Sequence, residues 1–258
     1  MFKPLARRLL ASEVFDQLRD RIVRGEMEPG APLPAERLLA TILRVNRNAV
    51  REGLKRLQQA GLVAIQQGEP TRVLDFRRTA GLELLATMLV GADGSIDTRI
   101  VRGIVELRTA LAPIVGRFAA QRATAQQVTA LRKVLADMTA AGEDTSKLAG
   151  LALDFWAEVV LATDNLALQL AFNSLAVSYG SVLEHLRHLM TAELRAEDEY
   201  RALVDAIAAG DEELAARHAT AIVSHGDTTF RRVTRVLDAA QSFTQPGPRP
   251  KPTKTKRS

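Results

Sequence analysis

Two neighbouring stretches decide the fold of this chain: 33-LPAERLLA-40 and, after four further residues, 45-VNRNAVRE-52. Apolar residues recur at helical spacing in both, which predicts a short helix over residues 35–43 and a second helix over 46–60. The second helix has an N-cap in Asn46 and a stop signal in Gly61. The side chains expected to face inward are Leu38, Leu39, Ile42 and Leu43 in the first helix and Val50, Leu54 and Leu57 in the second.

The flanking residues complete a small domain around these two helices. Upstream, residues 12–24 carry an apolar stripe of helical period, with Ser12 as the expected N-cap and Gly25 at the end. Downstream, residues 62–65 and 71–74 are expected to form two short strands, joined by the turn-rich tip 66–70. Three helices followed by a β-hairpin predict a winged helix-turn-helix domain over residues 1–76.

The outward face of the predicted 46–60 helix is basic. Arg47, Arg51 and Lys55 recur every four residues and therefore line one side. Asn46 and Asn48 lie at the N-terminal end of the same helix. Arginine can bind O6 and N7 of guanine, and asparagine can pair with N6 and N7 of adenine. The face therefore fits a recognition helix in the major groove of DNA; the alternative is a solvated basic face without a partner.

The same residues resemble the GntR family of bacterial regulators. The family pattern is a proline–small–Glu-Arg segment, a short turn and a helix with an Arg-x-x-x-Arg-Glu run, and the match spans residues 12–76. The family often has a serine cap at the position of Ala35, a role that alanine cannot take. By this resemblance, the residues that contact double-stranded DNA are Arg37, Asn46, Arg47, Asn48, Arg51, Gln67 and Gly68.

The rest of the chain has a helical pattern almost to its end. Residues 77–96 are expected to form a linker and linker helix, 97–240 an effector-binding and dimerisation domain, and 241–258 a disordered basic tail. The predicted fold class is mainly α: an N-terminal winged helix-turn-helix with a small β-hairpin, and an all-α C-terminal bundle of about seven helices. These helices are expected at 81–90, 97–122, 125–140, 145–163, 166–190, 192–209 and 211–238.

Residues after the hairpin narrow the resemblance to the FadR subfamily of fatty-acid-responsive regulators. The similarity lies in 65–68, 70–71, Val73, Phe76 and 80–82. The subfamily binds a long-chain acyl-coenzyme A, so the resemblance implies an acyl-coenzyme A or an organic acid as the effector. Val223 and Gly226 stand where the subfamily has a glycine and a serine near the ligand. The effector-binding residues that the resemblance implies are Arg108, Tyr179 and Phe230. Trp156 and Tyr200, at positions where relatives bind a metal, are further candidates for effector contact.

Two of these residues have structural alternatives. Arg108 either anchors an anion of the effector or forms an internal ion pair, because a buried arginine needs an anion in either case. Trp156, the single tryptophan, either fills the cavity or forms an apolar wall for a ligand. The sequence leaves both choices open.

Most relatives with a bundle of this type bind a metal through one aspartate and three histidines. The resemblance places the first two ligand positions at Ala152 and Trp156 and the other two at Tyr200 and Ile222, and these residue types do not suit a metal. We therefore expect no metal and no cofactor. The alternative is a relocated metal site among the histidines, which are His185, His188, His218 and His225.

The composition bears on other classes of protein. The chain has no cysteine, which excludes disulfides, thiolate metal sites and a cysteine nucleophile. It has no run of eighteen apolar residues and no signal-peptide pattern at its start, so we expect a cytoplasmic protein without membrane contact. A Walker loop and a Gly-x-Ser-x-Gly motif are absent as well, and we expect no enzymatic activity.

The distribution of charge agrees with a polyanionic partner. Residues 1–76 carry a net charge of +4 and residues 241–258 a net charge of +5, whereas the residues between them carry −4. The sequence thus predicts a homodimeric transcriptional repressor that binds a near-palindromic operator and responds to a small effector in its helical domain. The alternatives are a DNA-binding regulator with a filled cavity and no effector, a metal-dependent organic-acid sensor, and a helical enzyme fused to a DNA-binding module.

Overall fold

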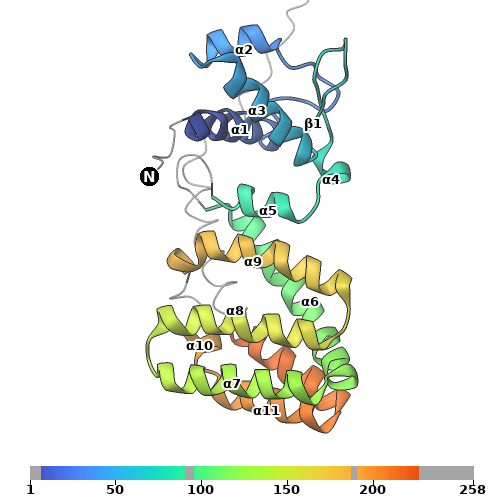
Figure 1. Ribbon diagram of the computed structural model, residues 1–258, viewed down its shortest axis with the longest axis vertical. Helices are drawn as coiled ribbons and strands as arrows, with labels where there is room; N and C mark the ends of the chain where they lie inside the picture. The colour runs from blue at the N-terminus through green and yellow to red at the C-terminus, as the bar shows by residue number, and fades with distance from the viewer. Residues whose placement is uncertain (1–6, 91–95, 187–190, 227–258) are drawn as a thin grey trace, which may run out of the picture.

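The computed structural model describes residues 7–90, 96–186 and 191–226 of the chain. Two groups of elements lie one above the other along the long axis (Figure 1). The N-terminal group contains a two-stranded sheet and is otherwise helical, and the C-terminal group is built of helices. The mainly helical fold class predicted from the sequence is confirmed.

The N-terminal group is a winged helix-turn-helix. Helices α1 (Arg7–Val23), α2 (Glu36–Ile42) and α3 (Arg47–Gln59) precede strands β1 (Val63–Ala64) and β2 (Arg72–Val73). The strands pair antiparallel, with Val63 opposite Val73. The buried core joins all of these elements and includes Val14, Phe15, Leu18, Ile22, Leu39, Val50, Leu54, Leu57, Leu62, Val63 and Val73.

Local signals account for the position of α3. The Asn46 side chain accepts a hydrogen bond from the backbone N–H of Ala49 at 2.8 Å, as an N-cap does. Gly61 follows the helix with a φ of +70°, a left-handed conformation that ends the helix and turns the chain into β1. Both signals predicted from the sequence are therefore confirmed.

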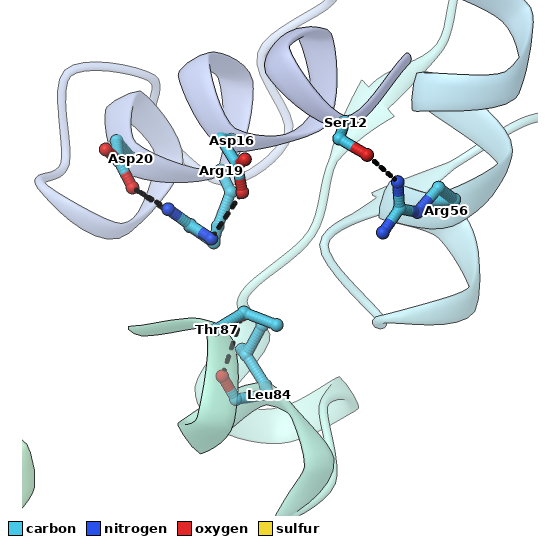
Figure 2. A network of polar contacts seen from close by, with 7 residues as sticks. All are labelled: Ser12, Asp16, Arg19, Asp20, Arg56, Leu84 and Thr87. Carbon is cyan, nitrogen blue, oxygen red and sulfur yellow. Dashed lines mark hydrogen bonds and ion pairs between the residues drawn. The ribbon is translucent and has the colours of Figure 1, made fainter. Parts of the chain in front are cut away.

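A polar contact between α1 and α3 fixes the direction of α3 (Figure 2). Arg56 donates a hydrogen bond to Ser12 Oγ at 2.8 Å, and its guanidinium lies 5.1 Å from the ring centre of Phe15. Arg19 approaches the same ring at 5.6 Å and is paired with Asp16 and Asp20. Of the two cation–π contacts, that of Arg56 adds to the apolar packing between α1 and α3, whereas that of Arg19 lies within α1.

Three expectations about the N-terminal elements are wrong. Ser12 does not cap α1, because the helix already includes Arg7 and the Ser12 hydroxyl instead binds Arg56. Leu38 and Ile42 do not face inward and are exposed, because α2 is short and reaches the core mainly through Leu39.

The C-terminal group is a bundle around a second core. It contains α6 (Thr98–Arg122), α7 (Ala125–Ala141), α8 (Thr145–Ala162), α9 (Leu166–Leu186), α10 (Thr191–Leu194), α11 (Glu197–Ala209) and a last helix over 212–226. The single helix expected over 192–209 is wrong, because the chain bends at residues 195–196 between α10 and α11. The last helix was expected to reach residue 238, and residues 227–238 lie outside the described part of the chain.

Two short helices connect the groups. α4 (Phe76–Thr79), which the sequence did not predict, follows the wing, and α5 (Glu83–Met88) lies between α1 and α9 (Figure 1). Leu84 of α5 is buried in the N-terminal core, whereas Leu89, directly after α5, is buried in the C-terminal core. The connection is thus part of both cores. None of the helices in the described residues has the length and apolar character needed to cross a bilayer.

Candidate functional site

The first candidate site is the exposed face around the N-terminus of α3. Arg47, Asn48 and Arg51 lie on the first turns of α3 and are exposed, and Asn46 is exposed at the cap. Arg37 is exposed on α2, the helix that precedes the turn. The predicted DNA-contacting residues of both helices are therefore accessible to a ligand in solution.

An ion pair connects the two helices at this face. Arg51 Nε donates to Glu36 Oε2 at 2.7 Å, so a residue of α2 fixes the direction of an arginine predicted to read DNA. Both side chains remain partly exposed, and the pair is therefore screened by solvent. Asn46 has a structural role through its cap, because its Oδ1 accepts the Ala49 N–H.

The tip of the wing is the third part of this face. Gln67 and Gly68 are exposed in the turn between β1 and β2, and Gly68 has a φ of +83°. A residue with a side chain rarely adopts this backbone conformation, which explains glycine at the turn. The predicted contact of both residues with DNA remains a prediction.

The second candidate site is an apolar cavity in the bundle. It has a volume of about 90 Å³ and is lined by residues of α6, α8, α9, α10 and the 212–226 helix. Its walls are almost entirely hydrocarbon, which suits an apolar ligand. The apolar residues of α8 and α9 among its walls are Ala149, Ala152, Leu153, Trp156, Val160, Leu168, Phe172, Leu175 and Ala176.

The charged residues that line the cavity are Arg108 of α6 and Glu193 of α10. Arg108 donates a hydrogen bond from its guanidinium to Glu193 Oε1 in a close ion pair. The Glu193 side chain is 1% exposed and that of Arg108 is 15% exposed. Burial raises the pKa of the Glu193 carboxyl, and Arg108 partly offsets this increase. Arg108 therefore forms an internal ion pair and lines the cavity at the same time.

Three aromatic residues pack beside this ion pair. The ring of Phe155 meets Tyr200 edge to face, with ring centres 4.8 Å apart, and meets Trp156 at 6.3 Å. Burial raises the pKa of Tyr200, and the negative charge of Glu193 raises it further. Trp156 Nε1 and the Tyr200 hydroxyl are buried without a hydrogen-bond partner within the described residues. Trp156 leaves part of the cavity open and forms one of its walls.

The residues at the positions where related bundles bind a metal are apolar or aromatic. Ala152 and Trp156 line the cavity, and Tyr200 and Ile222 are fully buried in the core. Within the described ranges, no group of three or more histidine, aspartate or glutamate side chains lies close enough to hold a metal. His218 is paired with Glu199 at 2.7 Å, and His225 is exposed.

Some predicted residues lie beyond what the structure describes. Tyr179 is part of α9, and its side chain is outside the described set; Phe230 and His188 lie outside the described residues, as does the His185 side chain. Their proposed roles remain predictions. Glu193, by contrast, was missed by the sequence reasoning. Nothing local in the sequence marks it; in the structure Gly226 faces it, and a Cβ atom at that position would collide with Glu193 Oε2.

Comparisons with known proteins match two segments of the chain to known domain families. Residues 10–73 match the model of bacterial regulatory proteins of the gntR family, and residues 103–225 match the FCD domain. The chain is 38% identical over 231 residues to the HTH-type transcriptional regulator Mce2R of Mycobacterium tuberculosis, which covers 90% of this chain and 95% of that protein. It is 40% identical over 100 residues to the fatty acid metabolism regulator protein of Vibrio cholerae, covering 39% of this chain and 36% of that protein.

A solved structure gives the same fold. The protein described as Lar, which controls the expression of the Listeria monocytogenes agr system, aligns with a TM-score of 0.56 and 15% identity over 90% of this chain and 99% of that chain. This likeness supports the arrangement of a winged domain on a helical bundle. With its helix-turn-helix domain and its FCD effector-binding domain, the chain belongs to the GntR family of HTH-type transcriptional regulators.

Proposed function

We propose that this regulator is a repressor that binds a near-palindromic operator as a homodimer and releases it when an effector occupies the bundle cavity. The observation that carries the DNA-binding part is the accessible row of Arg47, Asn48 and Arg51 on the first turns of α3. The first turns of a recognition helix are the part that contacts base edges in the major groove.

Support for a second copy of the chain comes from α9. The sequence has no charged residue from 166 to 183, although Gln169, Asn173 and Ser174 are polar, and a helix with apolar residues on more than one face is ordinarily buried. One face of α9 lines the cavity, whereas Leu166, Leu170 and Val177 are 67%, 57% and 67% exposed. We propose that this outer face packs against the same face of a second copy, because twofold interfaces are self-complementary.

Coupling between the cavity and the DNA-binding face has a short path through the fold. Leu168, Phe172 and Leu175 of α9 line the cavity, and α9 also packs against α5 (Figure 1). α5 in turn buries Leu84 in the core of the winged domain. An effector that favours one position of α9 therefore biases the winged domain as well, because a ligand shifts the equilibrium by its difference in affinity between two states.

The effector that we propose is an apolar molecule with an acidic head, such as an acyl-coenzyme A or an organic acid. The hydrocarbon walls of the cavity suit the apolar part, and Arg108 suits the anion. The partial match to a relative named for fatty acid metabolism agrees with this choice. The open cavity favours sensing over a filled, effector-free bundle. We expect no catalytic activity, and we expect the chain to act where the bacterial chromosome lies, in the cytoplasm.

A binding selection tests the DNA-binding part. Purified protein is used to select fragments from a random DNA pool, and the enriched sequences are aligned. We expect two inverted half-sites about one helical turn apart. Enrichment without sequence preference, or of a single half-site, contradicts the proposed dimer on a palindrome.

A thermal-shift screen tests the effector part. Acyl-coenzymes A of several chain lengths, organic acids and divalent metals are added in turn, because a ligand that binds only the folded state raises its melting temperature. An acidic ligand should raise the melting temperature and also release the selected DNA. Stabilisation by a divalent metal contradicts the proposed metal-free cavity.

A further inference from the structure

The Arg108–Glu193 ion pair lies at a wall of the cavity that is otherwise apolar. Among the described residues that enclose the cavity, these two are the charged ones. Arg108 is the more accessible partner, since 15% of its side chain is exposed against 1% for Glu193. The cation is therefore the part of the pair that an entering molecule meets, whereas the carboxylate is fully withdrawn from solvent.

One of the two carboxylate oxygens of Glu193 has a hydrogen-bond partner. Its Oε1 accepts the hydrogen bond from Arg108, while its Oε2 is buried and has no hydrogen-bond partner within the described residues. A carboxylate has about four acceptor positions, and a buried acceptor left unpaired costs free energy. The ion pair is thus less stable than a fully hydrogen-bonded pair, which makes its replacement by another anion easier.

The surroundings of Glu193 are built to admit a carboxylate and to let it move. α10, which carries Glu193, is four residues long and is separated from α11 by a bend. Gly226 of the 212–226 helix faces Oε2, and a Cβ atom there would collide with that oxygen. A glycine at this point leaves the space that the carboxylate fills.

We propose that Glu193 is an internal stand-in for the effector: its carboxylate occupies the place on Arg108 that the carboxylate of an acidic effector takes on binding. The inference rests on the proposed function and makes Glu193 a specificity-determining residue. The effector class is a monocarboxylate with an apolar tail. Exchange of the two carboxylates displaces α10 and completes the binding site.

The exchange has a consequence for protons. A displaced Glu193 that stays buried lacks a counter-ion, and a buried unpaired carboxylate takes up a proton instead. The described ionisable groups that act on it are Arg108 of α6, Tyr200 of α11 and His225 of the 212–226 helix. The cavity-lining residues of α8 and α9 are uncharged. Effector binding near neutral pH is therefore accompanied by net uptake of protons.

Titration calorimetry with hexanoate and 1-hexanol tests this exchange. The two probes share an apolar tail, and the alcohol lacks the anion. Glu193→Gln removes the competing charge, and we expect hexanoate to bind about tenfold tighter, with 1-hexanol changing less than threefold. Repeating the hexanoate titration in buffers of different ionisation enthalpy should show net proton uptake in the wild type and about none in Glu193→Gln.

Two further variants control the result. Glu213→Gln removes the glutamate of an exposed ion pair with Arg117, which lies on α6 as Arg108 does. This variant should leave the affinities for hexanoate and for 1-hexanol unchanged. Gly226→Ala pushes against the Glu193 carboxylate without removing it, and it should also strengthen hexanoate binding. A gain of hexanoate affinity in both Glu193→Gln and Gly226→Ala supports the exchange. Because two different variants are compared, the result does not depend on the folding of either one alone.

Three outcomes overturn the inference. In the first, Glu193→Gln binds hexanoate more weakly than the wild type, which makes Glu193 a support for Arg108. In the second, 1-hexanol gains as much as hexanoate. In the third, no carboxylate binds either protein although another ligand of the screen does, so that effector sensing stands and the exchange fails. If no ligand of any class binds, both the carboxylate exchange and the proposed effector function fail.

Discussion

Arg51 of α3 donates its Nε hydrogen to Glu36 of α2 at 2.7 Å, so the arginine predicted to read a base is positioned by the helix before the turn. Arg51→Ala is expected to weaken binding to the selected operator by roughly 1–3 kcal/mol, the cost of losing one base contact. Glu36→Gln keeps the arginine but loosens its direction. We expect a smaller loss on the operator and a slight gain on random DNA, because one negative charge is removed. Fluorescence anisotropy with both DNAs measures the ratio of operator affinity to random-DNA affinity. If Glu36→Gln leaves this ratio unchanged, Glu36 does not position Arg51.

Arg47 is expected to contribute through charge as well as through base recognition. Arg47→Ala should lower operator affinity and reduce the slope of log affinity against log salt concentration by about one, if the side chain also neutralises a phosphate. Arg78→Ala is a matched control, since this arginine is exposed on α4, the helix that follows the wing in the sequence. Binding isotherms at four salt concentrations give both slopes. Equal effects of the two substitutions would contradict a specific role of Arg47.

Burial of Glu193 predicts the sign of a pH dependence in the stability of the protein. The pKa of Glu193 is raised above the ordinary value of 4.5 by burial, so the folded state holds this proton more tightly than the unfolded chain. The associated stability is present below pH 4.5 and is lost as pH rises through the raised pKa. Glu193→Gln should therefore gain melting temperature relative to the wild type as pH increases from acid to neutral. A difference that shrinks with rising pH would show that Arg108 outweighs burial.

The exposed apolar face of α9 predicts that two copies of the chain associate through this helix. Leu170→Glu places a charge in the middle of the exposed apolar face and should convert the proposed dimer to a monomer at micromolar concentration, as measured by light scattering after size exclusion. Operator affinity should fall with it, because two half-sites are then no longer bound by one particle. Leu214→Glu is the control, as this leucine is partly exposed on the 212–226 helix. A dimer that survives Leu170→Glu would place the interface elsewhere.

The DNA-binding half was predictable because its signals are local. The cap at Asn46, the apolar period of α3 and the stop at Gly61 all lie within sixteen residues, and the structure has them in place. The orientation of α2 was not predictable in the same way. Period alone gives an apolar stripe, but which part of a seven-residue helix reaches the core depends on how α1 and α3 pack, and Leu38 is left exposed.

The effector half shows where local reasoning fails. Glu193 lies in the run 191-TAELRAEDEY-200, which resembles an exposed, acidic first turn. Its burial depends on Arg108, which is 85 residues away in sequence. The bend at residues 195–196 has the same origin: no glycine or proline marks it, and packing of Glu193 and Leu194 on one side and Tyr200 on the other separates α10 from α11.

The way in which α5 serves two cores limits how this regulator can evolve. Leu84 completes the core of the winged domain, and Leu89, five residues later, completes that of the bundle. A recombination event that joined residues 1–76 to a different sensing domain would leave a hole where Leu84 packs, a loss of roughly 2–5 kcal/mol for a leucine. We therefore expect that a functional exchange of the sensing domain has to include α5 with the winged domain. The new sensing domain must then have a surface like that of α9 against which α5 can pack. The packing of Leu84 thus extends the structural unit of the winged domain through α5, beyond its last strand.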